Sequence, residues 1–204
     1  MPEATSYLHP TIETESLFKD RGSKFYGYCV PTKTTEDVKS ALERVAEAHP
    51  QARHVCYAYV LGPDREDYRV NDDGEPSNSA GMPIYNQIKS NEITNVLVAV
   101  VRYFGGTKLG VPGLIHAYKT AAELAIGENK IVNHVVHAYY KIKYDYPQMD
   151  AAMHVAKVNN WNIIDQKFEL DCEVTVEVDL NQQSGFMQSL AAYPEIEVKH
   201  LHNA

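Results

Sequence analysis

The sequence predicts an α+β protein of two domains, residues 1–134 and residues 135–204. Segments in which apolar and polar residues alternate, as in half-buried strands, are interleaved with segments whose apolar residues recur at helical spacing. The run GENK at 127–130 ends one such helix and marks the domain boundary. Beyond it the predicted elements follow the order β-α-β-β-α-β, which is typical of a ferredoxin-like unit.

In residues 1–134 the predicted elements follow a polar lead. Residues 23–31 (SKFYGYCVP) alternate as a strand does. Residues 32–50 predict a helix, with Val38, Leu42 and Val45 at helical spacing, threonines at the N-cap and Pro50 just past the end. Strands are expected at 54–62 and 67–70, a turn-rich loop at 71–81 and a short helix near 82–90. Residues 95–104 (NVLVAVVRYF) are nearly all apolar, which predicts a central strand covered on both faces, and a helix is expected from Val111 to Glu128.

In residues 135–204 the pattern predicts four strands and two helices. The strands are expected at 135–145, 161–169, 171–179 and 195–201. The helices are expected at 146–160 and 182–193, between the first and second and between the third and fourth strands.

Composition places the chain among soluble cytoplasmic proteins. No apolar run approaches the ~18 residues that a membrane helix needs, and the polar N-terminus does not resemble a signal or transit peptide. Cys29, Cys56 and Cys172 show no paired spacing and are expected to be reduced core thiols. The formal charge of −8 argues against a protein that coats nucleic acid, so a phosphate contact would need a local patch. Residues 1–134 are the less acidic part.

The stretch VVRYFGGTKLGVPGLIHAYKTAA, residues 100–122, connects the central strand to the next helix across four glycines. A chain that enters a helix through such a turn directs free N–H groups at one point, where the helix dipole adds positive charge. Arg102 could complete an anion site there as a bidentate donor. Alternatively, the glycines only permit a tight turn and a close approach of helix and strand. The spacing matches neither G-x-G-x-x-G nor the P-loop.

The loop NDDGEPSNSAG, residues 71–81, carries three acidic side chains. Asp72, Asp73 and Glu75 offer the oxygen ligands that Mg²⁺ or Ca²⁺ prefers, but they lack the spaced ligand set of an EF-hand. The alternative is structural, with a carboxylate of this solvated turn paired to Arg53 or Arg102. No metal or cofactor is predicted.

Two further features suggest chemistry. Arg53 and His54 begin a strand, where side chains can reach a cleft, although a lone histidine facing the side of Cys56 is more often a packing residue. Cys56 is not expected to be a nucleophile, because no orienting partner is evident and strand interiors rarely expose a thiol. The tyrosine pairs in residues 26–28 and 57–59 would stack bases if exposed, or would stabilise the sheet as cross-strand pairs if covered.

Three segments together resemble the YigZ/IMPACT family, also known as uncharacterised protein family 29. They are HPQARHVCYAYVLG, NDDGEPSNSAGMPI and VVRYFGGTKLGVPGLIHAY, and the lead DRGSKFYGY is similar to the family's opening segment. The resemblance covers nearly the whole chain. It implies an N-terminal domain like ribosomal protein S5 domain 2 and elongation factor G domain IV, and a ferredoxin-like C-terminal domain like elongation factor G domain V.

The resemblance also implies a type of function. Eukaryotic relatives regulate translation through the activator of an initiation-factor kinase, using an additional RWD domain. This chain looks like the shorter bacterial type without that domain, for which association with nucleic acid or the ribosome is the usual inference. The family's motif positions are Arg53, His54, Asp73, Gly74, Glu75, Pro76, Arg102, Tyr103, Gly105, Gly106, Gly110, Gly113 and Tyr118. The chain departs from the family at Asn78 and Pro112, where glycine is common, and at His116, where a basic residue is usual.

The first functional hypothesis is a non-enzymatic accessory protein of translation that binds RNA or the ribosome, motivated by Arg53, Arg102, Lys108 and Lys119. An enzyme acting on a small phosphorylated or acylated molecule by Arg102 and Glu75 is the alternative. A protein partner docked on the acidic C-terminal domain is the third hypothesis. The predicted anion-binding residues are Arg53, His54, Asp73, Glu75, Arg102, Gly105, Gly106, Lys108 and Gly110.

Overall fold

A five-stranded antiparallel sheet forms the centre of the larger of two units in the computed structural model, which describes residues 4–168 and 172–204. The larger unit spans Tyr7–His134, and the described residues of 135–204 form the other together with residues 4–6. The sheet order is β2 (Thr14–Asp20), β3 (Ser23–Pro31), β6 (Val96–Tyr103), β4 (His54–Leu61) and β5 (Asp67–Asn71). The protein is therefore α+β, as predicted.

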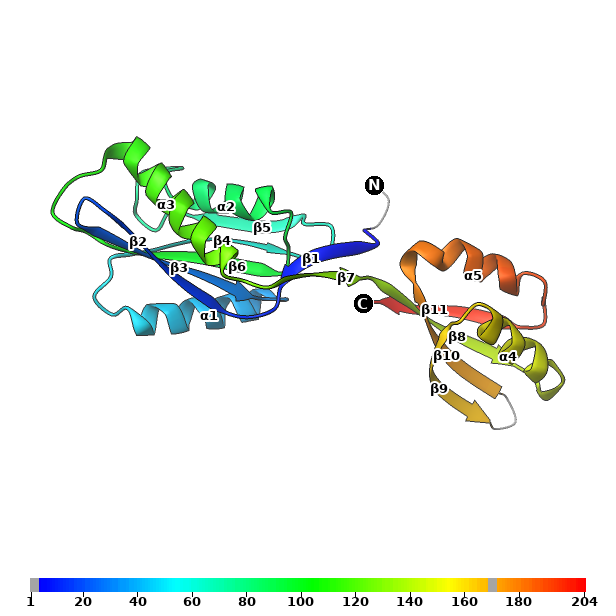
Figure 1. Cartoon of the computed structure of the whole chain (residues 1–204). Helices are drawn as coiled ribbons and strands as arrows, with labels where there is room; N and C mark the ends of the chain where they lie inside the picture. Colours follow the sequence, from blue (N-terminus) through cyan, green and yellow to red (C-terminus); the bar gives the residue numbers. More distant parts are fainter. Residues whose placement is uncertain (1–3, 169–171) are drawn as a thin grey trace. The chain divides into compact units, whose positions relative to one another are not determined.

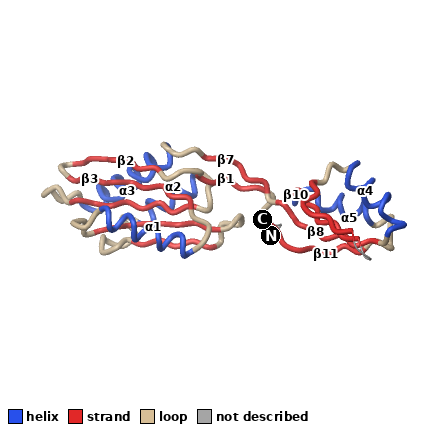
Figure 2. The backbone as a smooth tube through the Cα atoms, turned by 90° about the horizontal axis from the view of Figure 1, so that it is seen from below, coloured by secondary structure: helices blue, strands red, loops and turns tan. Residues whose placement is uncertain are grey.

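Helices cover both faces of this sheet. Helix α1 (Thr35–Ala48) packs on one face, and α2 (Gly81–Ser90) and α3 (Gly110–Gly127) pack on the other (Figures 1 and 2). The central strand β6 shows why its sequence is so apolar. Val96, Val98 and Val100 face α2 and α3, whereas Leu97, Ala99 and Val101 face α1. All six are completely buried, so the prediction of a central strand covered on both faces is confirmed.

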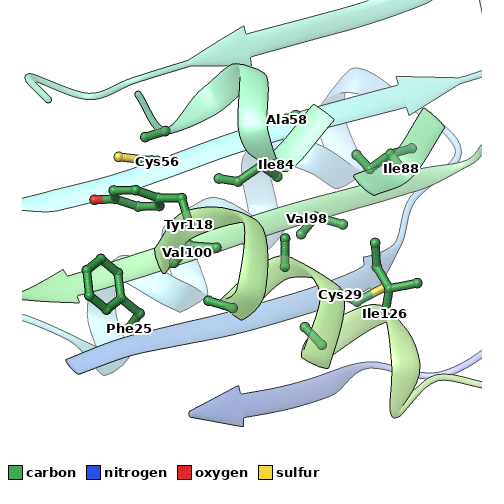
Figure 3. Close-up of a cluster of buried hydrophobic side chains, with 14 of the residues drawn as sticks. Phe25, Cys29, Cys56, Ala58, Ile84, Ile88, Val98, Val100, Tyr118 and Ile126 are labelled. Atoms are coloured by element: carbon green, nitrogen blue, oxygen red, sulfur yellow. The ribbon is translucent and has the colours of Figure 1, made fainter. Parts of the chain in front are cut away.

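The core beneath α2 and α3 extends to one end of the sheet. There the ring of Tyr118 lies between Phe25 and Cys56 (Figure 3). Cys29, Cys56 and Cys172 are free and buried, as predicted. Burial raises the pKa of Cys29 and of Cys56 to about 12, so both thiols stay protonated.

The tyrosines that could have stacked bases lie under α1 instead. Tyr28 and Tyr59 belong to the core on the α1 face, and Tyr26 and Tyr57 pack against it. His49, just after α1, bonds through its ring nitrogens to the hydroxyls of Tyr28 at 2.6 Å and Tyr103 at 3.0 Å. Of the two alternatives, the structure contains the covered sheet face.

The smaller unit has a four-stranded antiparallel sheet. Its elements are β8 (His137–Tyr144), α4 (Met149–Val158), β9 (Asn162–Phe168), β10 (Cys172–Asp179), α5 (Gln183–Leu190) and β11 (Glu197–Asn203), with short 3-10 turns at Tyr146–Gln148 and Leu180–Gln182. The sheet order is β11-β8-β10-β9 (Figure 1). The elements follow one another in the predicted order β-α-β-β-α-β.

Two strands lie outside both main sheets. β1 (Ser6–Pro10) pairs with β7 (Ile131–Val135) as a two-stranded sheet. The strand expected at 135–145 is therefore divided, with β7 ending at Val135 and β8 beginning at His137. Within the described residues, no helix is both long and apolar enough to span a membrane.

Candidate functional site

Arg102 is the central residue of the site. It continues the side of β6 that faces α2 and α3, because side chains alternate along a strand and Val100 is on that side. The register places Arg102 opposite Phe25 on β3 and opposite His54 on β4. Its side chain is 9% exposed, which is rare for an arginine and calls for a partner.

Glu75 is that partner. Arg102 Nη1 donates to Glu75 Oε1 at 2.6 Å, and the Tyr118 hydroxyl donates to the same oxygen at 2.8 Å. The Glu75 side chain is 5% exposed, so the ion pair is almost completely out of water. Burial, with Cys56 and Glu75 close by, raises the pKa of Tyr118 well above its usual range, so the hydroxyl remains a donor. This is one of the two pairings expected of the acidic loop.

Aromatic rings enclose the Arg102 guanidinium. Its Cζ lies 5.7 Å from the centroid of Phe25 and 5.6 Å from that of Phe104, within cation–π distance of both. Its Nε is buried and has no hydrogen-bond partner within the described residues. A buried donor without an acceptor is costly. Arg102 is thus held by Glu75 and the two rings at the cost of one unused hydrogen bond.

Asp72 and Asp73 hold the loop rather than face a ligand. The Asp72 carboxylate accepts from the N–H groups of Asn78, Ala80 and Gly81 at 2.8–3.0 Å, where α2 begins. Asp73 Oδ2 accepts from Val55 N at 2.7 Å. Among the described residues, no three His, Cys, Asp or Glu side chains gather as a metal site would require.

The backbone of this loop explains one departure from the family pattern. Asn78 has φ of 61°, the left-handed region that glycine favours and asparagine tolerates best among other residues. Asp73 and Gly74 are also left-handed, at 41° and 83°. This bend brings the Asp73 carbonyl to His54 Nδ1, 2.7 Å away. Because a carbonyl only accepts, Nδ1 carries the proton, and a neutral His54 has Nε2 as an acceptor.

Helix α3 begins beside Arg102. Gly110, its first residue, has φ of 71°, and Pro112 lies in the first turn, as predicted. Leu109 at the N-cap offers no side-chain hydrogen bond, and the first turn has no acidic residue. The positive end of the helix dipole is therefore not neutralised by a cap or an acid of its own first turn.

These parts surround a pocket of about 670 Å³. Its walls combine cationic side chains with apolar ones, and among the residues that the structure describes Glu75 is the only acidic one in the lining. The lining residues are Gln51, Arg53, His54, Glu75, Pro76, Arg102, Tyr103, Phe104, Lys108, Leu109, Gly110, Val111 and Leu114. Three permanent positive charges and one negative charge make it an attractive site for an anion.

All lining residues fall within the segment 21–126, which matches the family model of the Impact N-terminal domain. The chain belongs to the IMPACT family. An IMPACT family member of Haemophilus influenzae is 27% identical over 186 residues, 90% of each chain. The IMPACT family member YigZ of Escherichia coli is 31% identical over 146 residues, 71% of this chain and 72% of YigZ. A crystal structure of a hypothetical protein matches with a TM-score of 0.70 and 25% identity, covering 99% of both chains.

The structure of this IMPACT protein brings together six of the nine predicted anion-binding residues: Arg53, His54, Glu75, Arg102, Lys108 and Gly110. Asp73 lies behind them and orients His54. Gly105 and Gly106 do not line the pocket, and Gly105 N already donates to Ser23 Oγ at 3.1 Å. Lys119 also lies outside the lining.

Sequence reasoning missed Phe104, Gln51 and the α3 wall. Phe104 belongs to the family run Arg-Tyr-Phe-Gly-Gly, and an aromatic residue in a glycine turn could have been singled out. Val111 and Leu114 are three residues apart, a helical spacing that places them on one face of α3. No sequence signal marks Gln51.

Proposed function

We propose that this protein is a non-enzymatic accessory protein of translation that binds RNA or the ribosome through the pocket around Arg102. The supporting observation is that Arg53, Arg102 and Lys108 line one pocket with a single acid among them. The family resemblance adds the connection to translation, because eukaryotic relatives regulate it.

RNA binding by an acidic protein needs a local cluster of positive side chains. With a net charge of −8, the chain as a whole repels phosphate. Arg53 and Lys108 are exposed and free to reach a backbone phosphate, whereas Arg102 is fixed by Glu75. Two exposed cations around a buried one suit phosphate contacts that position RNA without reading its sequence.

We also propose a fold for each of the two domains. The order β11-β8-β10-β9 with helices between strands suits a ferredoxin-like domain in residues 135–204. For residues 1–134 we propose the S5 domain 2-like fold that the family implies. Together these would form the pair of domains that elongation factor G carries.

Co-sedimentation with ribosomes at low salt tests this function. Arg53→Ala and Lys108→Ala should each reduce the bound fraction, because each removes one phosphate contact. Lys119→Ala is the matched control, since Lys119 is an exposed cation of the same unit outside the pocket, and it should bind as the parent does. Equal losses in all three variants, or no binding by the parent, would contradict the proposal.

A second candidate is an enzyme acting on a small phosphorylated or acylated molecule. A volume of about 670 Å³ is typical of small-molecule pockets, and His54 in its lining is the candidate base. Glu75 is less suited to move a proton, because Arg102 and Tyr118 both donate to it. Turnover of p-nitrophenyl phosphate or acetate that disappears in His54→Gln would favour the enzyme, and absence of turnover would remove its support.

A further inference from the structure

The pocket around Arg102 suits the end of an RNA chain better than its middle. We infer that it takes the terminal phosphomonoester of single-stranded RNA, with the terminal base against Phe104. This inference rests on the proposed function and narrows it to one class of ligand.

Charge is the first argument. Among the lining residues Arg53, Arg102 and Lys108 are positive and Glu75 is negative, which leaves two positive charges to be balanced. A phosphomonoester carries about −1.5 to −2 at pH 7, whereas an internal phosphodiester carries a single charge. The terminal group is therefore the closer match to the pocket.

Burial is the second argument. Arg102 is 9% exposed and forms part of a concave wall, so a ligand meets it inside the pocket and not on an open surface. An internal phosphodiester has a ribose on each side, and both riboses would have to enter with it. A terminal phosphate has three free oxygens and one ribose, so it can approach from one direction.

The fixed position of the Arg102 guanidinium is the third argument. Nη1 donates to Glu75 and Nε is buried, so the group is held in one direction. The charge is delocalised over the whole guanidinium, so a phosphate that enters the pocket meets a positive charge already in place. The start of α3 offers backbone N–H groups in the same pocket.

Phe104 supplies the site for a base. It is 58% exposed, lines the pocket and lies beside the Arg102 guanidinium. An aromatic ring left open to solvent next to a phosphate site is what unpaired bases stack on, and the contact tolerates any base. A paired base is already stacked in its helix, so a single-stranded end is the suitable ligand.

Isothermal titration of the full chain with short single-stranded oligonucleotides of one sequence tests the inference. The oligonucleotides carry a 5′-phosphate, a 3′-phosphate or no terminal phosphate. One phosphorylated end should bind at least about tenfold more tightly than the unphosphorylated oligonucleotide. Phe104→Ala should lose about tenfold in affinity for that end.

Ile115→Ala is the control for Phe104, because Ile115 is an exposed apolar residue of α3 outside the lining. It should leave the affinity unchanged. Equal binding of all three oligonucleotides, reduced by Arg53→Ala and Lys108→Ala, would overturn the terminal-phosphate inference and leave the proposed function standing. Absence of binding by every oligonucleotide would also overturn it, and the co-sedimentation with ribosomes would then decide the proposed function separately.

Discussion

At the scale of the residue, the site depends on one buried ion pair. Arg102 and Glu75 are almost fully removed from water, and the Tyr118 hydroxyl shares the acceptor oxygen. Taking either charge away leaves the other buried without compensation, which costs far more than an exposed pair contributes. Breaking the pair therefore destabilises the fold, and the intact pair fixes the direction of the guanidinium in the pocket.

Glu75→Ala should destabilise the protein by about 3 kcal/mol or more, because Arg102 would remain buried and unpaired. Urea unfolding followed by circular dichroism measures the loss. The control is Glu43→Ala, which breaks the exposed pair with Lys39 in α1 and should cost less than about 0.5 kcal/mol. A Glu75 variant as stable as the Glu43 variant would show that the buried pair is not what holds Arg102.

Glu173 makes stability depend on pH in the smaller unit. Hydrogen bonds from Lys143 and Lys141 lower the pKa of Glu173 to about 2. A lowered carboxyl pKa contributes stability above the unfolded value, near pH 4.5, and that stability is lost as pH falls toward 2. The urea midpoint of the parent should therefore drop more between pH 5 and pH 2.5 than that of Glu173→Gln. Equal drops would contradict the assignment.

At the scale of the element, two glycines of the turn between β6 and α3 are required for different reasons. A Cβ on Gly105 would lie 1.9 Å from the backbone carbon of Gly22, in the β2–β3 turn. A Cβ on Gly106 meets nothing within 4 Å, although φ of 89° disfavours any side chain. Gly105 is thus required by close packing, and Gly106 by backbone conformation alone.

Alanine substitutions should rank accordingly. Gly105→Ala should cost more than about 2 kcal/mol, because two backbones must separate. Gly106→Ala should cost about 1 kcal/mol through its left-handed backbone. Gly127→Ala, at the end of α3 with open space around it, should stabilise by about 0.5 kcal/mol. Thermal unfolding of the three variants checks the order. Equal melting temperatures for Gly105→Ala and Gly127→Ala would contradict it.

Strand β2 shows what the sequence pattern could not predict. Two of its inward residues, Thr14 and Ser16, are polar and Phe18 is apolar, so the apolar alternation of a strand is incomplete. The Thr14 hydroxyl donates to the Ala125 carbonyl of α3 at 2.7 Å, and the Ser16 hydroxyl donates to the Ala121 carbonyl at 3.1 Å. Small polar residues suit this place because α3 packs closely on the sheet, where a Cβ on Gly27 would be 2.4 Å from the Ala121 oxygen. By contrast, β6 was predictable from its unbroken apolar run.

At the scale of the whole molecule, the pocket draws on three separated stretches of chain, residues 51–54, 75–76 and 102–114, and each contains residues that were recognisable by type alone. Their assembly depends on the register that sets His54 and Phe25 opposite Arg102. No local pattern encodes that register, since it results from pairing between strands far apart in sequence. The candidate residues were therefore predictable, and so was the pairing of an acid of the 71–81 loop with Arg53 or Arg102. The choice of Glu75 and Arg102, the contact with Tyr118 and the place of Phe104 in the pocket were not.

The central claim is that phosphate enters this pocket, and the salt dependence of binding to single-stranded RNA tests it most directly. The logarithm of the observed affinity should fall linearly with the logarithm of salt concentration. Arg53→Ala and Lys108→Ala should each make the slope shallower by about 0.7, the value for one contact to a single strand, while Lys119→Ala keeps the parental slope. A slope unchanged in both pocket variants would contradict the account.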